Sequence, residues 1–208
     1  MYIHLYKQQT IEGVAQSVTS TNITLESDSS AIDEFYTGWE VLITAGALVN
    51  QKRTITEYNG TTKVATVSAW SGFSETYLSQ YRLIGILNSG DTTGEQISEE
   101  TGLNPLTVFG LNASLDQVSE GIKVALRCDS GYETVGDAVI SFIGTTLLKW
   151  AVSLDNTTWS EYGEGISITD KIKNTNKLFY IRAKSSNDEV PVNDTTVDIK
   201  VDTVIGVT

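Results

Sequence analysis

The stretch RTITEYNGTTKVATVS, residues 53–68, decides the fold class of this chain. Its two halves alternate in side-chain polarity with a period of two, as half-buried strands do. Between them stands Asn59-Gly60, a dipeptide that suits the positive φ angles of a tight hairpin turn. The stretch therefore predicts a β-hairpin with its turn at Asn59 and Gly60.

Strand-like segments flank this hairpin on both sides. The alternating residues 2–6 predict an edge strand or an arm laid on a partner. A polar segment without strand pattern is predicted at 26–34, and the strand-like run 77–87 is the last part of the module. Further short strands are predicted at 14–18, 22–25 and 39–44, and the candidate core or rim residues are Trp70, Tyr77, Tyr81 and Leu83.

The pattern breaks over residues 88–105, which are rich in Asn, Ser, Gly and Asp and end in Pro105. We therefore predict an N-terminal β-module at 1–88, a linker at 89–106 and a second domain at 107–208. About seven short strands over about 100 residues is the count of an immunoglobulin-like sandwich. These strands are predicted at 107–111, 122–128, 138–143, 148–153, 165–168, 178–183 and 196–204. The expected fold is all-β, a small barrel-like or sandwich-like module followed by an immunoglobulin-like β-sandwich.

Charge narrows the class of partner. Of the 208 residues, 14 are Lys or Arg and 26 are Asp or Glu, so the formal net charge is −12. A nucleic-acid site would need a stripe of basic residues, and the nearest candidate is the cluster Lys171, Lys173 and Lys177. This cluster is typical of a solvated loop. We therefore expect no nucleic-acid partner. No apolar run approaches the roughly 18 residues of a membrane span, and no membrane partner is expected.

Residues able to do chemistry are few. His4 is the only histidine and Cys128 the only cysteine, so neither a catalytic triad nor a zinc site can be assembled. Two acidic groups offer oxygen ligands for calcium but lack the spacing of an EF-hand. They are Glu26/Asp28/Asp33/Glu34 and Asp188/Glu189/Asp194. We expect a non-enzymatic protein with no catalytic residues, no cofactor and no metal site.

Aromatic residues leave one binding function open. In an all-β chain, aromatic side chains at strand positions usually belong to a core or a subunit interface. The alternative is a sugar-binding groove, in which loops near Trp159 and Tyr162 would stack on a glycan of the host surface. The tryptophans are Trp39, Trp70, Trp150 and Trp159.

Two segments of the sequence resemble a known protein family. Residues 38–70, GWEVLITAGALVNQKRTITEYNGTTKVATVSAW, together with SQYRLIG at 79–85, resemble a small β-module of tailed-bacteriophage virion proteins. That module occurs in head-fibre, head-decoration and tail-appendage components. The recognisable parts are YNGTTK and SQY, whereas the segment SGFSE at 71–75 lacks the proline expected there. The pattern WAVSLDNTTWSEY at 150–162 also resembles immunoglobulin-like or fibronectin-like modules of phage structural proteins.

The resemblance implies a bacteriophage virion structural protein, a decoration or head-fibre protein on the outer capsid surface, assembled in the host cytoplasm. Its partners would be the major capsid protein or other virion proteins, and further copies of itself, with a trimer favoured. The N-terminal module, led by the arm at 1–7, would pack on the capsid lattice. The alternatives are a tail-fibre, baseplate or neck component and, from another class, a carbohydrate-binding adhesin.

Overall fold

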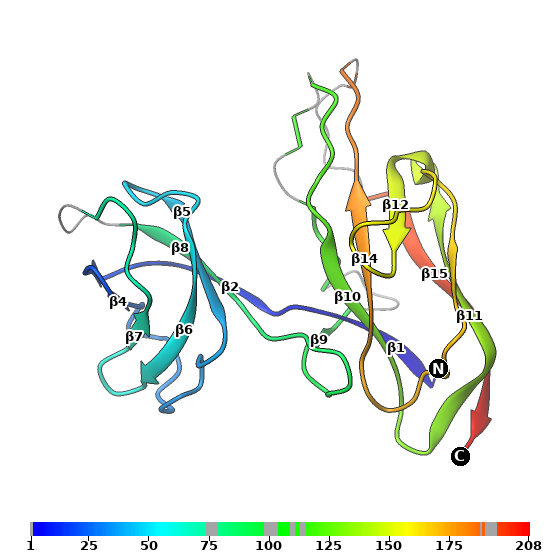
Figure 1. Ribbon diagram of the computed structural model, residues 1–208, viewed down its shortest axis with the longest axis horizontal. Helices are drawn as coiled ribbons and strands as arrows, with labels where there is room; N and C mark the ends of the chain where they lie inside the picture. The colour runs from blue at the N-terminus through cyan, green and yellow to red at the C-terminus, as the bar shows by residue number, and fades with distance from the viewer. Residues whose placement is uncertain are drawn as a thin grey trace. The chain divides into compact units, whose positions relative to one another are not determined.

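In the part of the chain that the structure describes, antiparallel β-strands make up the regular structure apart from one short 3₁₀ turn, which confirms the all-β class. The computed structural model describes residues 2–73, 79–97, 104–108, 111–112, 115–187, 189 and 195–208. The chain divides into two compact units (Figure 1). One is Gln8–Ile86, and the other, called here the sandwich unit, combines residues 1–7 with Leu87–Thr208.

The unit Gln8–Ile86 contains one seven-stranded sheet in the order β2-β8-β5-β6-β7-β4-β3. Its two edge strands are consecutive in the chain, separated by Ala15 and Gln16, so the sheet curls back on itself. It is not closed into a barrel within the described residues. The strands are β2 (Thr10–Val14), β3 (Ser17–Val18), β4 (Asn22–Thr24), β5 (Glu40–Ala45), β6 (Lys52–Asn59), β7 (Val64–Val67) and β8 (Gln80–Ile84).

Inward-facing side chains from these strands form the core of this unit. Of the expected core residues, Trp70, Tyr81 and Leu83 are buried, and Tyr77 lies outside the described residues. The aromatic rings are tightly packed, since Tyr36 meets Tyr58 edge to face with 4.8 Å between ring centroids. Such packing gives the unit a hydrophobic core of its own.

The predicted hairpin is confirmed by the pairing of β6 with β7, but its turn differs from the expected one. The last paired residues are Asn59 and Val64, so the turn spans residues 60–63. Positive φ occurs at Lys63 (59°) and at neither Asn59 nor Gly60. The Asn59 carboxamide oxygen instead accepts the N–H groups of Thr61 and Thr62 at 3.1 and 2.8 Å. Side-chain hydrogen bonding therefore replaces the two-residue turn.

Two antiparallel sheets build the sandwich unit. The first has the order β12-β14-β10-β1-β9 and the second β13-β11-β15. A 3₁₀ turn, η1 (Leu147–Lys149), precedes β12. The strands are β1 (Ile3–Lys7), β9 (Glu95–Gln96), β10 (Ile122–Cys128), β11 (Tyr132–Gly144), β12 (Trp150–Ser153), β13 (Ile166–Ile168), β14 (Lys177–Ala183) and β15 (Val197–Val207).

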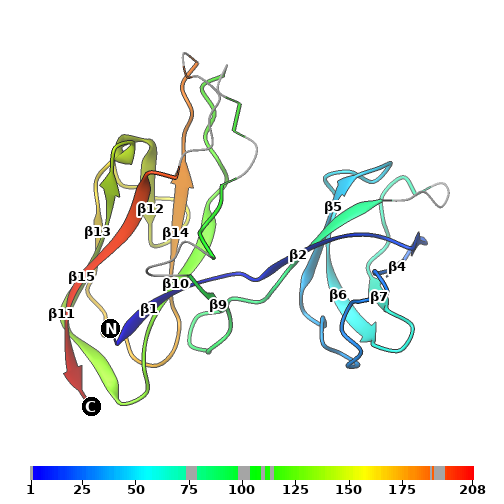
Figure 2. The same cartoon turned by 180° about the vertical axis from the view of Figure 1, so that it is seen from behind.

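The core of this unit lies between the two sheets. Leu126 and Phe179 come from the first sheet and Ile140 and Ile168 from the second, and all four are buried. The two layers can be followed in Figures 1 and 2, with β10 and β14 nearer the viewer in Figure 1 and β15 nearer in Figure 2. The sandwich architecture is therefore as expected.

Its connections differ from those of an immunoglobulin domain. From β10 to β15, each successive strand lies in the sheet opposite the previous one. Immunoglobulin sandwiches instead place some consecutive strands side by side in one sheet. The strand β11 is also longer than predicted, because a bulge between Val135 and Val139, with Gly136 at φ 84°, lets it continue past an irregular point.

The N-terminal segment departs most clearly from expectation. Residues 2–6 were predicted to be an arm or edge strand of the first domain, yet β1 pairs with β10 along its whole length and with β9 at Tyr6 and Lys7. β9 itself lies in the stretch expected to be a linker. The chain thus passes between the units twice, after Lys7 and after Ile86. Of the strand predicted at 107–111, the described residues are not in a strand.

Candidate interaction surfaces

The segment 26–38 of the unit Gln8–Ile86 is held in place by the hairpin β6–β7. The Tyr58 hydroxyl donates to the carbonyl of Ser30 at 2.7 Å, and the Asp33 carboxylate accepts the Gly60 N–H at 2.8 Å. The Lys63 ammonium group donates to the same Ser30 carbonyl at 3.1 Å. A segment without strands is thereby fixed at several points by a rigid support.

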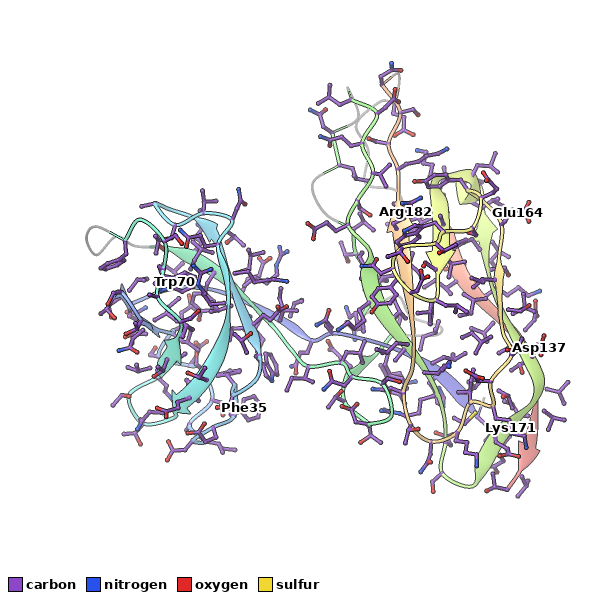
Figure 3. All side chains as sticks on the ribbon, in the orientation of Figure 1. Phe35, Trp70, Asp137, Glu164, Lys171 and Arg182 are labelled. Atoms are coloured by element: carbon purple, nitrogen blue, oxygen red, sulfur yellow. The ribbon has the colours of Figure 1, made fainter. Side chains whose placement is uncertain are left out.

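Two large apolar side chains project from this fixed segment. Ile32 is 65% exposed and Phe35 is 45% exposed. Phe35 packs edge to face on Tyr36, with ring centroids 4.9 Å apart, and lies at the rim of the unit (Figure 3). Asp33 and Glu34 stand between them, both exposed. We call these four positions, 32 to 35, the Ile32–Phe35 surface, an apolar pair with an acidic centre.

Tyr58 makes the anchoring of this segment sensitive to alkaline pH. Burial raises the pKa of its hydroxyl from 10.0 to about 12. The unfolded chain then loses this proton at lower pH than the folded chain, so the stability that the neutral hydroxyl provides is complete below pH 10 and is lost as pH rises to about 12. We expect the urea midpoint of the full chain to fall across this window, and less steeply in Tyr58→Phe. Parallel profiles for the two proteins would contradict this.

Four of the acidic residues considered for calcium, Glu26, Asp33, Glu34 and Glu189, have other partners. Glu26 accepts the Val14 N–H at 2.7 Å, and Glu34 accepts the Thr37 hydroxyl. Glu189 pairs with Lys149, whereas Asp188 and Asp194 lie outside the described residues. Among the residues the structure describes, no three His, Cys, Asp or Glu side chains come together as a metal site would require.

Trp159 and Tyr162, the residues expected to stack on a sugar, contact cationic side chains of the sandwich unit. The Arg182 guanidinium lies 4.3 Å from the centre of the Trp159 ring, and the Lys184 ammonium lies 4.1 Å from that of Tyr162. All four side chains are half-buried, and Arg182 is labelled in Figure 3. Cation–π contact occupies a face of each ring, which favours a packing role over a sugar platform.

The turn before Trp159 explains the Ser-x-Asp pattern in the sequence. The Asp155 carboxylate accepts the N–H groups of Thr157 and Thr158 at 2.8 and 2.7 Å. The Ser153 hydroxyl oxygen accepts the N–H of Asn156 at 3.0 Å. Hydrogen bonds to the charged form hold the pKa of Asp155 well below its usual range. The Ser-x-Asp pattern therefore specifies a turn that is stabilised by hydrogen bonds from its own backbone N–H groups to its own side chains.

His4 and Cys128 lie on opposite faces of the first sheet. Ile3, the partner of Cys128 in the register, points into the core, and His4 follows it on the other face. The His4 imidazole lies 3.4 Å from Asp129, while the Cys128 thiol contacts the carbonyl of Ile172 at 3.4 Å. Burial raises the pKa of Cys128 to about 11, so its thiol stays protonated at neutral pH.

The lysines that came nearest to a basic stripe are paired with carboxylates. Lys171 and Lys173 both approach Glu133, and Lys177 approaches Asp170. Lys171 is labelled in Figure 3. Each pair has one exposed partner, Lys171, Lys173 or Asp170, so solvent screens the attraction and each pair contributes little to stability.

Comparison with known proteins gives no relative, since no family model, curated protein or solved structure matches the chain. Within the described part of the chain, no helix has the length and apolar character needed to span a membrane.

The Ile32–Phe35 surface was not anticipated from the sequence. It falls at the end of a segment whose composition reads as a polar excursion, and the available signal was the pair of large apolar residues in the run AIDEFY. This run lacks the period-two alternation of a strand, so the pattern that indicates strands does not identify it.

Proposed function

We propose that this chain is a non-enzymatic bacteriophage virion structural protein, attached to the outside of the head as a decoration or head-fibre protein. The observation that carries the proposal is the resemblance of residues 38–70 and 79–85 to a phage virion module. Those residues supply β5, β6, β7 and β8, which are neighbouring strands of one compact unit with its own core. A tail-fibre, baseplate or neck component remains the alternative within this class.

The Ile32–Phe35 surface is the face we propose for docking on the major capsid protein. Exposed apolar side chains on a fixed support bind with little loss of conformational freedom, which favours affinity. The acidic residues between them would meet basic or polar groups of the capsid. Repetition of the contact over a lattice then multiplies a weak interaction through high effective concentration.

Rebinding to stripped heads tests this proposal. Purified protein is mixed with virions freed of their outer proteins, and bound protein is measured by co-sedimentation. We expect the wild type to bind heads and the double variant Ile32→Ser/Phe35→Ser to bind at least about thirtyfold more weakly, as for central residues of an interface. Val49→Ser is the matched control, because Val49 is an exposed apolar residue of the same unit (46% exposed).

Each alternative has its own outcome in this experiment. Binding to tails instead of heads would move the protein to the appendage class. A specific signal on a glycan array without binding to heads would favour the adhesin. Wild-type protein that ignores virions altogether would overturn the virion proposal, and equal losses in the double variant and in Val49→Ser would overturn the docking face.

A further inference from the structure

The strand β15 forms an open edge of the second sheet of the sandwich unit. In the order β13-β11-β15 it pairs with β11 on one side, and no described residue continues the sheet on the other. It spans 11 residues, Val197–Val207, which is long for an unprotected edge. Such an edge presents a row of backbone groups that can accept another strand.

Hydrogen bonding determines which backbone groups face outwards. The Thr208 N–H donates to the Gly131 carbonyl beside the start of β11, at 3.0 Å. Because N–H and C=O groups alternate in direction along a strand, even-numbered residues of β15 direct theirs towards β11. The odd-numbered residues, Val201 among them, direct theirs to the open edge.

Side chains on the outer face of β15 carry a short charge pattern. Asp198, Lys200, Asp202 and Val204 all point outwards and are exposed, with Val204 64% exposed. Lys200 and Asp202 approach each other along the strand at 2.7 Å. The neighbouring outer residue Val139, opposite Asp202 on β11, is also exposed, so the charges border an apolar strip.

We propose that β15 pairs antiparallel with β15 of a second copy, about a two-fold axis at Val201. In this register Lys200 faces Asp202 of the second copy and Asp202 faces its Lys200, so the axis generates two ion pairs. Residues directly opposite in an antiparallel ladder point to the same side, which keeps both outer faces together. Positions 197 to 205 of one strand then face positions 205 to 197 of the other.

Neighbouring registers are less favourable. An axis at Lys200 would place the two lysines opposite each other, and an axis at Asp202 would oppose the two aspartates, which is destabilising. An axis at Ile199 also brings Lys200 opposite an aspartate, Asp198. It overlaps only positions 197 to 201, however, and leaves the rest of β15 open.

This contact differs from the trimer that the family resemblance favours. A two-fold contact uses the same surface on both copies and closes at two. It would join two three-stranded sheets into one continuous sheet and cover the open edge. The inference does not rest on the proposed virion role, because it uses only the sheet order and charges of β15.

A charge-exchange series measured by light scattering tests the pairing. Full-length protein is run on size-exclusion chromatography over a range of concentrations, at about 0.15 M salt so that the net negative charge of each copy is screened. We expect a dimer whose dissociation constant rises about tenfold or more in Lys200→Asp, since two attractive contacts become repulsive. The exchange Lys200→Asp/Asp202→Lys restores the opposite charges and should restore the dimer.

The exchange variant also identifies the register. If the axis lay at Ile199, the new aspartate at position 200 would face Asp198 and the dimer would stay weakened. Lys52→Asp is the matched control, because Lys52 forms an ion pair of similar exposure with Glu40, at 3.1 Å, on the interior strands β5 and β6. A monomer at all concentrations, a trimer, or equal effects of Lys200→Asp and Lys52→Asp would overturn the pairing.

Discussion

Deletion of residues 1–7 is expected to unfold the sandwich unit while leaving Gln8–Ile86 folded. The deletion removes β1, which lies inside the first sheet between β10 and β9. β10 would lose the ladder that it forms with β1 at five paired positions. Ile3, which is 5% exposed in the core, would leave a gap between the sheets.

Side-chain contacts of β1 add to the loss. The Arg127 guanidinium lies 3.7 Å from the centre of the Tyr6 ring, and the rings of Tyr2 and Tyr132 stack with centroids 4.1 Å apart. Burial of Ile3, the ladder and these contacts together are worth about 5 kcal/mol or more, which approaches the whole stability of an ordinary domain. The remaining strands are therefore not expected to hold the fold.

Hydrogen exchange followed by mass spectrometry measures the two units separately through their own peptides. After the deletion, peptides from β10 and β14 should exchange at rates near those of an unfolded chain, whereas peptides from β5 and β6 should keep their protection. Protected β10 peptides would contradict the prediction. A companion chain that lacks residues 8–86 and joins Lys7 to Leu87 by a short linker should keep protection in β10.

The linker in that companion chain need only be short, because Lys7 and Leu87, the residues of the sandwich unit that flank the excised one, both lie near Gly94. A Cβ placed on Gly94 would lie 3.2 Å from the Lys7 carbonyl oxygen and 2.5 Å from a methyl carbon of Leu87. A unit inserted between adjacent positions of another can be removed without stretching the host. Removal of residues 1–86, in contrast, would delete the whole unit Gln8–Ile86 and also take β1 from the sandwich unit, which is why point variants serve the head-binding test.

The same strand shows how far the sequence predicts the fold. Alternation along residues 2–6 identifies a strand but carries no information on which strand it pairs with. His4 contacts Asp129, 125 positions later, and no local pattern encodes so distant a contact. The predicted domain boundary therefore followed composition, which changes near residue 88, and could not assign the first seven residues to the sandwich unit.

Strands with local signals were predicted more closely. The expected strand at 122–128 coincides with β10, and the one at 178–183 matches β14 to within one residue. The interaction surfaces could not be predicted in this way, because they are properties of the assembled sheets. They depend on the exposure of Ile32 and Phe35 and on the open edge of β15. Polarity of individual residues predicts burial only where a regular period accompanies it.

Gly60→Ala is expected to lower the free energy of unfolding by about 3 kcal/mol, near the upper end for overpacking. The φ angle of Gly60 is not positive, so backbone strain is not the reason. A Cβ at this position would lie 2.4 Å from the carbonyl carbon of Ala31 and 2.6 Å from that of Ile32. Backbone cannot rotate aside as a side chain can, so either the hairpin turn or the segment 26–38 must move.

Movement there breaks the anchors of the Ile32–Phe35 surface. The Gly60 N–H would leave Asp33, and the Tyr58 hydroxyl would leave Ser30. Three measurements should therefore change together in Gly60→Ala. The urea midpoint falls, the pKa of Tyr58 moves back towards its ordinary value as the hydroxyl gains solvent, and binding to stripped heads weakens as it does in Ile32→Ser/Phe35→Ser.

Gly72→Ala separates this steric effect from a general effect of replacing glycine. Gly72 has φ 67° and no atom within 4 Å of an added Cβ, so only backbone strain of about 1 kcal/mol is expected there. Its Tyr58 pKa and its head binding should match those of the wild type. If Gly60→Ala destabilised the chain no more than Gly72→Ala, the contact between the turn and Ala31 would not be fixing the surface, and the docking face would need another support.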